Sequence, residues 1–375
     1  MKLPIYDVLI IGAGIVGAAC AAACAAEGLS VGIAEAEMIG GGATAAGMGH
    51  LVVMDDSEAQ FALTRYSQTL WQRLSSDLPP DVEYEGCGTI WVAADAEEMS
   101  AVTQKKAFYE SRGVRTEVLD AQSLREAEPN LHSGLPGGLL VPEDAVIYAP
   151  CAARFLAEQA QSRGAHLHLP RVVTEIAPDG VRLNDGTSIV AQSIVIAAGT
   201  WSANLTPGIE VRKRKGHLVI TDRYPGFVHH QLVELGYLKS AHSLTQESVA
   251  FNIQPRKTGQ LLLGSSRQFD KDSSAVDHRI LGRMLARAQE FIPSLGPLSA
   301  IRTWVGFRAA TPDKLPLIGP MPGHDNLFLA TGHEGLGITT SLGTARLLVD
   351  QLLHRTPEIS VAPYLPGRVY ENAHA

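Results

Sequence analysis

The feature that most constrains the fold is a strand, a glycine loop, a helix and a second strand that follow one another near the start of the chain. Residues 7–11 form a short β-branched run, and the hexapeptide GAGIVG at residues 12–17 follows it directly. An alanine-rich stretch continues to Glu27, Gly28 ends it, and residues 30–34 form a second apolar run. This order predicts a βαβ unit of a parallel sheet, and therefore a fold of the α/β class.

The glycines of that loop have the spacing of a dinucleotide-binding turn. Gly12 allows a tight turn, Gly14 lets the backbone approach a pyrophosphate, and Gly17 lets helix and strand pack closely. The N–H groups at the start of the helix, where Ile15 and Val16 stand, would face the phosphates with the positive end of the helix dipole. The loop therefore predicts a dinucleotide site.

An acidic residue stands where such a unit contacts a ribose. Glu35 lies 23 residues after Gly12, at the end of the second strand, where a carboxylate would hydrogen-bond both ribose hydroxyls. Ala36 follows it and is predicted to lie beside the same ligand. Because a carboxylate at this position would repel a phosphate on the ribose 2′ oxygen, a dinucleotide with a 2′-phosphate is disfavoured. The alternative is a doubly wound sheet without a ligand, since glycine also serves ordinary tight turns.

A long uncharged run overlaps this unit. Residues 8–26 carry no charge over nineteen positions, which is about the length of a membrane span or a secretory signal. The three glycines and the preceding Asp7 do not suit either interpretation. We expect neither a transmembrane span nor a cleaved signal.

Composition narrows the class of protein further. With 375 residues, 45% of them hydrophobic and 19% charged, the chain suits two interleaved domains. A formal charge of -8 offers no surface for nucleic acid. Four cysteines without a CxxC predict no disulfide scaffold and no metal site, and favour a reducing, cytoplasmic location. Cys20 and Cys24 are predicted to be small buried residues of the first helix; a redox or metal pair is the alternative.

Three later segments have the small residues expected where a backbone lies against a large cofactor. Residues 40–50 read GGGATAAGMGH, in which Thr44 offers a hydroxyl to phosphate. Residues 193–201 read SIVIAAGTW, a buried strand that ends in small residues. Residues 326–353 contain a strand, a glycine-rich turn at 332–337 and an amphipathic helix, whose start would stabilise negative charge on a flavin. Each segment has a ligand-free packing turn as its alternative.

The chain resembles the D-amino-acid oxidase type of FAD-dependent amine oxidoreductases, which includes glycine oxidase, sarcosine oxidase and D-amino-acid dehydrogenase. The resemblance covers nearly the whole chain and rests on four stretches: the first βαβ unit with Glu35, AAGTW at 197–201, WVGFRAATPDKLPLIGPMPG at 304–323, and ATGHEGLGI at 330–338. It implies a Rossmann-type FAD-binding domain made of discontinuous segments, and a substrate domain whose antiparallel sheet covers the flavin. The expected fold class is α/β for the FAD-binding domain and α+β for the whole chain. The domain bounds expected are residues 1–80, 142–214 and 302–375 for the first domain, and 81–141 and 215–301 for the second.

The fingerprint, the later segments and the resemblance together predict the contacts to FAD. They are Gly12, Gly14, Ile15, Val16, Gly17, Glu35, Ala36, Thr44, Ala45, Gly47, Met48, Val173, Ala198, Gly199, Trp201, Arg308, Gly332, His333, Gly335, Leu336, Gly337 and Ile338.

The resemblance also suggests catalytic residues. In that family an arginine commonly clamps the substrate carboxylate, and Arg308 stands at the matching position. A planar, permanently charged fork suits this role, because it binds a carboxylate bidentately and fixes the reacting carbon. His50 and His333 lie in loops expected to flank the flavin, where each would shape the pocket or take a proton; a purely structural hydrogen bond is the alternative. Tyr148 and Tyr237 are weaker candidates for the pocket wall, with core packing as their alternative.

Two departures from the family pattern limit the prediction. Glycine oxidases typically carry a second arginine where this chain has Gly335, so the substrate need not be glycine. Sarcosine oxidases with covalent flavin carry a cysteine just before the TPD run, where this chain has Gly306, Phe307 and Arg308. We therefore expect noncovalent FAD.

A narrower resemblance concerns the substrate. The stretches GSSRQFD, WVGFRAATPDKLPLIGP and GHEGLGITTSLGTARLL look most like the flavoprotein subunit of bacterial D-hydroxyproline dehydrogenases. This implies oxidation of a cyclic secondary amino acid to its imine, by hydride transfer to flavin N5. Glycine or sarcosine oxidation, or a broad D-amino-acid dehydrogenase activity, is the alternative, and a non-catalytic FAD-binding scaffold subunit is an alternative of another class.

The same resemblance implies partners. Such subunits often pass electrons to other flavin or iron–sulfur subunits of a hetero-oligomer, and this chain has too few clustered cysteines to hold a cluster itself. A quinone or oxygen is the alternative acceptor. The resemblance therefore also allows a peripheral location of the protein at the inner membrane, through partners that accept the electrons, besides a cytoplasmic location.

Overall fold

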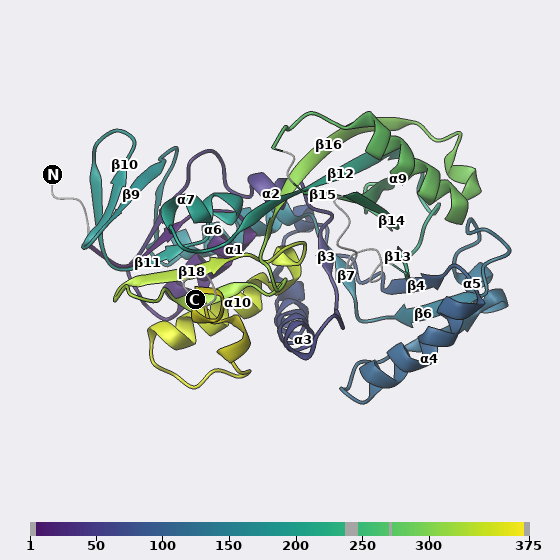
Figure 1. The fold of residues 1–375 in the computed structure, drawn as a ribbon, viewed down its shortest axis with the longest axis horizontal. Helices are drawn as coiled ribbons and strands as arrows, with labels where there is room; N and C mark the ends of the chain where they lie inside the picture. Colours follow the sequence, from purple (N-terminus) through teal and green to yellow (C-terminus); the bar gives the residue numbers. More distant parts are fainter. Residues whose placement is uncertain (1–4, 237–246, 270–271, 371–375) are drawn as a thin grey trace. The chain divides into compact units, whose positions relative to one another are not determined.

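The computed structural model describes residues 5–236, 247–269 and 272–370, so Tyr237 lies outside the described residues. The chain divides into two compact units, each made of separate segments (Figure 1). Unit 1 comprises Met1–Val82, Tyr148–Lys213 and Phe307–Ala375, and unit 2 comprises Glu83–Ile147 and Arg214–Gly306.

Unit 1 contains an eight-stranded sheet in the order β17-β18-β11-β1-β2-β8, with β10 beside β11 and β9 beside β10. Neighbouring strands from β18 to β8 are parallel, whereas β17 joins β18 antiparallel. The strand bounds in this unit are β1 Ile5–Ile11, β2 Val31–Ala34, β3 His50–Leu51, β8 His166–His168, β9 Val173–Ala177, β10 Gly180–Leu183, β11 Ser188–Ile196, β17 Leu317–Pro320 and β18 Leu327–Thr331.

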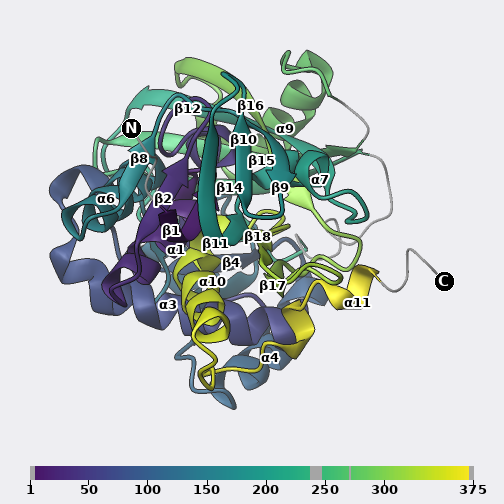
Figure 2. The same cartoon turned by 90° about the vertical axis from the view of Figure 1, so that its left-hand side faces the viewer.

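Four helices of unit 1 form a packed group, since α1 contacts both α6 and α10, and α10 contacts α3 (Figure 2). The bounds are α1 Ile15–Ala26, α2 Gly42–Ala45, α3 Glu58–Leu74, α6 Ala149–Ser162, α7 Ser202–Leu205, α10 Gly337–Leu352 and α11 Gly367–Tyr370, with the 3-10 helices η1 Ser75–Asp77, η2 Pro80–Val82, η3 Gly199–Trp201 and η5 Ala362–Tyr364. Small side chains allow this close packing in α1, where Ala18, Cys20 and Cys24 are fully buried.

The uncharged run of residues 8–26 is divided between β1 and α1. Its hydrophobicity therefore serves a buried parallel strand and a buried helix. In the part of the chain that the structure describes, no helix has both the length and the apolar character that a membrane span requires.

Unit 2 contains a second eight-stranded sheet in the order β16-β12-β15-β14-β13-β4-β6-β5. Among the described residues, β13 pairs with β4 in parallel, whereas the pairs β12–β15, β15–β14, β14–β13, β4–β6 and β6–β5 are antiparallel. The bounds are β4 Thr89–Ala93, β5 Glu117–Asp120, β6 Gly137–Val141, β7 Ala145–Val146, β12 Arg212–Arg223, β13 Gln231–Glu234, β14 Glu247–Pro255, β15 Gln260–Phe269 and β16 Ala300–Ala310, with helices α4 Ala96–Glu110, α5 Ala121–Ala127, α9 His278–Phe291 and η4 Pro293–Leu295. The predicted class, helices with a parallel and an antiparallel sheet, is confirmed.

Helices lie on both faces of the unit 2 sheet. The face that carries Ile90 and Val92 belongs to the apolar core that includes residues of α9. The intervening Trp91 points to the other face, where the Lys105 ammonium of α4 lies 4.2 Å from its ring centroid. Figure 1 shows α9 and α4 on opposite sides of this sheet.

An aromatic pair fastens α9 to the sheet. The rings of Phe251 on β14 and Phe291 at the end of α9 are stacked, with centroids 4.4 Å apart and planes within 6°. Both side chains are almost completely buried. Because each ring covers the other, we infer that this pair contributes strongly to the stability of unit 2.

Replacing Phe291 by alanine is expected to lower the free energy of unfolding by about 3–5 kcal/mol, because the variant loses buried apolar surface and leaves a cavity. Phe291→Leu keeps more of the volume and should lose less than half as much. Urea unfolding at pH 7 measures both. A loss under about 1 kcal/mol in the alanine variant would show that α9 is held elsewhere.

Candidate active site

The ends of four parallel strands lead directly into the predicted site residues. Gly12 follows β1, Glu35 follows β2, Ala197 follows β11 and Gly332 follows β18. Because the carboxyl ends of parallel strands meet at one edge of a sheet, these residues come together although they lie far apart in sequence.

The turn between β1 and α1 leaves no space for side chains. Gly12 has a φ of +101°, and a β-carbon there would lie 2.7 Å from the Ala197 carbonyl oxygen. A β-carbon on Gly17 would lie 2.0 Å from the carbonyl oxygen of Gly12. Glycine at both positions therefore lets α1 start close against β1 and β11, in the form that suits the pyrophosphate of a dinucleotide.

The start of α1 is reached by two other segments. Its N-cap is Gly14, with no capping side chain and no acid in the first turn. The buried hydroxyl of Thr44 accepts a hydrogen bond of 3.0 Å from the Ile15 N–H. A β-carbon on Gly337 would lie 3.8 Å from Val16 Cγ2, so the starts of α1 and α10 are neighbours. Thr44, predicted as a phosphate contact, is thus also the side chain that holds its loop on α1.

Glu35 is fixed beside the same turn. Its Oε2 accepts a hydrogen bond of 2.7 Å from the Ala13 N–H, and its Oε1 accepts one of 2.8 Å from the Glu37 N–H. These bonds orient a half-buried carboxylate whose oxygens have further lone pairs. Ala36, which follows, is exposed. The arrangement fits an acid that receives ribose hydroxyls.

The loop of residues 40–50 is fastened to α10. A β-carbon on Gly47 would lie 2.7 Å from Ile338 Cδ1, so the loop backbone lies against the first turn of that helix. The Thr339 hydroxyl donates a hydrogen bond of 2.8 Å to the carbonyl oxygen of His50. Met48, between them, is half-buried. This contact places the loop beside the glycine turn that precedes α10.

The segment after β11 is tied to the end of β18. The Thr331 hydroxyl donates to the Gly199 carbonyl oxygen at 3.1 Å, and the Ser202 hydroxyl donates to Thr331 Oγ1 at 2.9 Å. Trp201 is 54% exposed, and its ring lies 3.9 Å from the position of a β-carbon on Gly42. The AAGTW segment therefore lies beside the loop that carries Thr44.

Arg308, at the end of β16, lies against the glycine turn. The Glu334 N–H donates to the Ala309 carbonyl oxygen at 2.9 Å, which holds the turn on the strand. A β-carbon on Gly335 would lie 3.4 Å from Arg308 Nε and 3.5 Å from its Cδ. The half-buried Arg308 side chain thus passes directly beside a residue that has no side chain.

The other candidates differ in burial, since His333 and Val173 are buried whereas Tyr148 is exposed. His333 Nε2 lies 2.9 Å from Thr344 Oγ1, and burial lowers the pKa of this imidazole to about 3. His333 is therefore neutral near pH 7 and does not titrate there. Val173 packs in the apolar core with Ile11 and Ala34, which leaves its backbone as the part available to a ligand. Tyr148 precedes α6 and is 38% exposed.

Two contacts that assemble the site could not be predicted from the sequence. Thr331 and Thr339 each donate a hydroxyl to a carbonyl oxygen of another predicted segment. The only signal in the sequence is that both stand beside the glycine turn, at the end of β18 and in the first turn of α10. Nothing in the pattern shows which way their hydroxyls point.

These features define a class: a parallel sheet whose first glycine turn, helix start and acid after β2 suit a dinucleotide. The family model for FAD dependent oxidoreductases, named DAO, matches residues 7–351, and the chain belongs to this family. The predicted resemblance to FAD-dependent oxidoreductases of amines and amino acids is confirmed.

Individual relatives extend over nearly the whole chain. A glycine oxidase from Pseudomonas aeruginosa is 28% identical, with 96% of this chain and 98% of that protein covered. The hydrogen cyanide synthase subunit HcnC of the same species is 27% identical, with 97% and 96% covered. Among solved structures, glycine oxidase from Geobacillus kaustophilus matches with a TM-score of 0.86 at 26% identity, with 96% of this chain and 98% of that chain covered.

The burial of His333 predicts a pH dependence of stability. The folded protein holds this histidine neutral, whereas the unfolded chain protonates it below its ordinary pKa of 6.5. Its contribution to stability is therefore present above pH 6.5 and is lost as the pH falls toward 3, by about 2 kcal/mol between pH 7 and pH 5. Urea unfolding of the wild type and His333→Phe at both pH values measures it. Equal pH dependence in the two proteins would contradict the assignment.

Proposed function

We propose that this protein oxidises a cyclic secondary amino acid, of the proline or D-hydroxyproline type, to its imine. Unit 1 would be the FAD-binding domain and unit 2 the substrate domain. The observation that carries the proposal is the position of Arg308, whose Nε lies 3.4 Å from the place of a β-carbon on Gly335 in the turn before α10. A permanent cation thus lies beside the glycine turn, at the same sheet edge as the start of α1.

The residues of unit 1 fit FAD. The start of α1 would receive the pyrophosphate, Glu35 the ribose, and the turn that precedes α10 the flavin, since the positive end of a helix stabilises negative charge. FAD, when bound, supplies the hydride acceptor of the reaction. The segments around Thr44 and Trp201 would cover the cofactor between these ends. No cysteine stands in the GFRAATPD stretch, which supports noncovalent binding.

Arg308 would bind the substrate carboxylate and orient the carbon that loses hydride. The guanidinium is planar and always charged, so two parallel hydrogen bonds fix a carboxylate more firmly than a lysine would. This restraint lowers the entropy cost of reaching the reactive geometry. Since Arg308 lies on the segment matched to the carboxylate clamp of the family, the role rests on both position and chemistry.

Gly335 supports a substrate larger than glycine. Glycine oxidases typically have a second arginine there, and even a β-carbon at this position would lie within 3.5 Å of the Arg308 side chain. Without a side chain at 335, space beside the guanidinium is left for a substituent on the reacting carbon. A ring that joins this carbon to the nitrogen would use that space.

The substrate must lose its proton to react as a neutral amine. His50 is the candidate proton acceptor, because an imidazole can take a proton from an ammonium group and its loop is bonded to α10 through Thr339. Burial lowers the pKa of His333 to about 3, which favours His50 over His333 for this role.

Relatives favour two further possibilities. The similarity to glycine oxidases favours glycine or sarcosine oxidation as the second candidate, with a broad D-amino-acid dehydrogenase as a variant of it. HcnC is by name a subunit of a synthase, which supports a hetero-oligomer in which other flavin or iron–sulfur subunits accept the electrons. In such an assembly a non-catalytic scaffold role is the alternative, and the presence of Arg308 argues against it.

An anaerobic titration of the purified yellow protein tests the substrate. The flavin band should bleach with cis-4-hydroxy-D-proline or D-proline, and not with glycine, sarcosine or D-alanine. Bleaching by glycine or sarcosine alone would favour the oxidase alternative. A protein that binds FAD but bleaches with no amino acid would favour the scaffold alternative.

Replacing Arg308 by alanine should raise the substrate concentration for half-maximal flavin reduction by about 100-fold and slow the reduction, because a bidentate ion pair is lost. Arg308→Lys should restore part of the affinity. Stopped-flow absorbance measures both, and the unchanged visible spectrum shows that FAD stays bound. An unchanged saturation curve would remove Arg308 from the carboxylate role.

Replacing Glu35 by alanine should weaken FAD binding by about 10–100-fold, because hydrogen bonds from the ribose to a charged acceptor are lost. Glu37→Ala is the control, since Glu37 contributes only its backbone N–H to this contact. Titration of apoprotein with FAD, followed by flavin fluorescence, gives both dissociation constants. Equal affinities of the two variants would contradict the ribose contact.

A further inference from the structure

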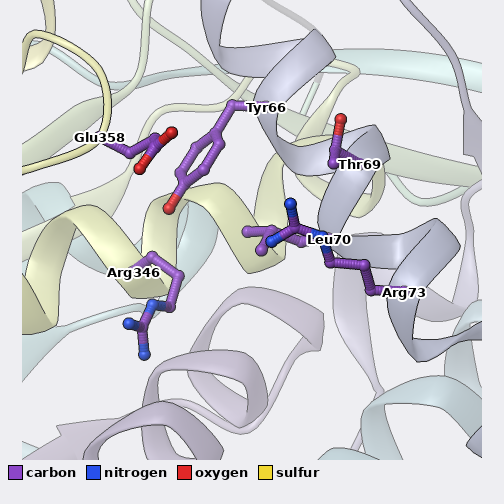
Figure 3. Close-up of a pocket in the computed structure, with 6 residues that line it drawn as sticks. All are labelled: Tyr66, Thr69, Leu70, Arg73, Arg346 and Glu358. Atoms are coloured by element: carbon purple, nitrogen blue, oxygen red, sulfur yellow. The ribbon is translucent and has the colours of Figure 1, made fainter.

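A hollow of about 560 Å³ lies between α3, α10 and the segment that follows α10 (Figure 3). Its size is in the range of small-molecule sites. The residues that line it are Tyr66, Thr69, Leu70, Arg73, Arg346 and Glu358. The first four recur at the spacing of one helix face, so a single stripe of α3 forms one wall.

The hollow is separate from the flavin site within unit 1. Arg346 stands nine residues after Gly337, which begins α10, or about 13 Å along the helix axis. None of the residues predicted to contact FAD or substrate lines it. Any ligand bound here would therefore be additional to the cofactor and the substrate.

Two hydrogen bonds hold the segment after α10, which forms a further wall of the hollow. The Arg355 guanidinium donates a hydrogen bond of 2.7 Å to Glu27, and the buried Tyr364 hydroxyl donates one of 2.6 Å to the carbonyl oxygen of Ala59 on α3. Glu358 lies between Arg355 and Tyr364 in sequence. The segment that carries Glu358 is thus fastened at both ends, which keeps its carboxylate at the rim of the hollow.

The charges in the hollow have opposite signs on opposite sides. Figure 3 shows Arg73 and Glu358 on either side of Tyr66. The Arg346 guanidinium is already paired with Glu27 at 3.2 Å. Among the described residues, Arg73 has no carboxylate within ion-pair distance, so its guanidinium is available to a ligand. A ligand with only negative charge would gain from Arg73 but would be repelled by Glu358.

Between these charges the hollow offers a hydroxyl and an apolar contact. Burial raises the pKa of Tyr66, so its hydroxyl stays protonated, and it shares a side-chain hydrogen bond with Arg346. Leu70 is half-buried and presents an apolar surface beside Arg73. A molecule with an anion at one end, a cation at the other and a short carbon framework matches this arrangement.

We propose that this hollow binds a free α-amino acid, with its carboxylate on Arg73, its ammonium group on Glu358 and its side chain against Leu70. An arginine fork is suited to a carboxylate, and two opposite charges select a zwitterion over either ion alone. Both side chains are exposed, so salt screens the interaction and the affinity is expected near about 1 mM. This site would exist whichever amine the flavin site oxidises.

Anaerobic calorimetry on the Arg308→Ala holoprotein tests the site, because that variant has lost the proposed carboxylate anchor of the flavin site. The probes are glycine, acetate and methylammonium at low ionic strength. Glycine should bind with one equivalent, and at least about tenfold more tightly than acetate or methylammonium. No saturable heat with glycine would overturn the proposal, and equal binding of acetate would show an anion site instead.

Two variants test the residues. Arg73→Gln and Glu358→Gln, each in the Arg308→Ala background, should weaken glycine binding by at least about tenfold. Arg163→Gln, at the exposed end of α6, is the matched control and should change nothing. Unchanged binding in both test variants would overturn the assignment. If Arg308→Ala does not fold, the wild type serves instead, in which Arg73→Gln should remove one equivalent of bound glycine.

Measurements of flavin reduction distinguish the proposed site in the hollow from the proposed substrate site at the flavin. Arg73→Gln and Glu358→Gln in the otherwise wild-type protein should keep the half-saturation of anaerobic bleaching by the preferred substrate. A large increase of the half-saturating substrate concentration in both variants would mean that the hollow belongs to the flavin site, which contradicts the proposal. If no amino acid bleaches the flavin but glycine still binds in the hollow, the proposed function fails and this inference stands.

Discussion

The close approach of α1 to β1 and β11 is the constraint on which the rest of unit 1 depends. A β-carbon on Gly17 would lie 2.0 Å from the Gly12 carbonyl oxygen, and one on Gly12 would lie 2.7 Å from the Ala197 carbonyl oxygen. Backbone therefore packs on backbone at this point, and the helix start is brought to the edge where the parallel strands end. The positive end of the helix dipole is brought to an anionic ligand there because of this packing.

The remaining site follows from the same edge of the sheet. Each of β1, β2, β11 and β18 ends there, and short hydrogen bonds connect the loops that follow them. Ala13 N–H donates to Glu35, Ile15 N–H to Thr44, and Thr331 to Gly199. These loops hold one another, so a cofactor would meet a surface that is already ordered. Such preorganisation lowers the cost of binding a large ligand.

The sequence predicted the parts of this site that backbone patterns determine. Strand lengths and glycine spacing place Glu35 and the turn before α10, and the FRAATPD stretch identifies Arg308. Side-chain direction could not be read in the same way. His333 turns inward to a hydrogen bond with Thr344, about two turns along α10, and Val173 joins the core beside Ile11. The hollow beside α3 was invisible for the same reason, since Tyr364 positions Glu358 from a distant segment.

We propose above that Arg308 anchors the carboxylate of a cyclic amino acid in the FAD-containing protein. A crystal structure of the holoprotein with pyrrole-2-carboxylate, a planar analogue of proline, tests it most directly. We expect both carboxylate oxygens within about 3 Å of the Arg308 guanidinium, and FAD with its pyrophosphate at the start of α1. A carboxylate bound away from Arg308 in a protein with FAD in place would contradict it.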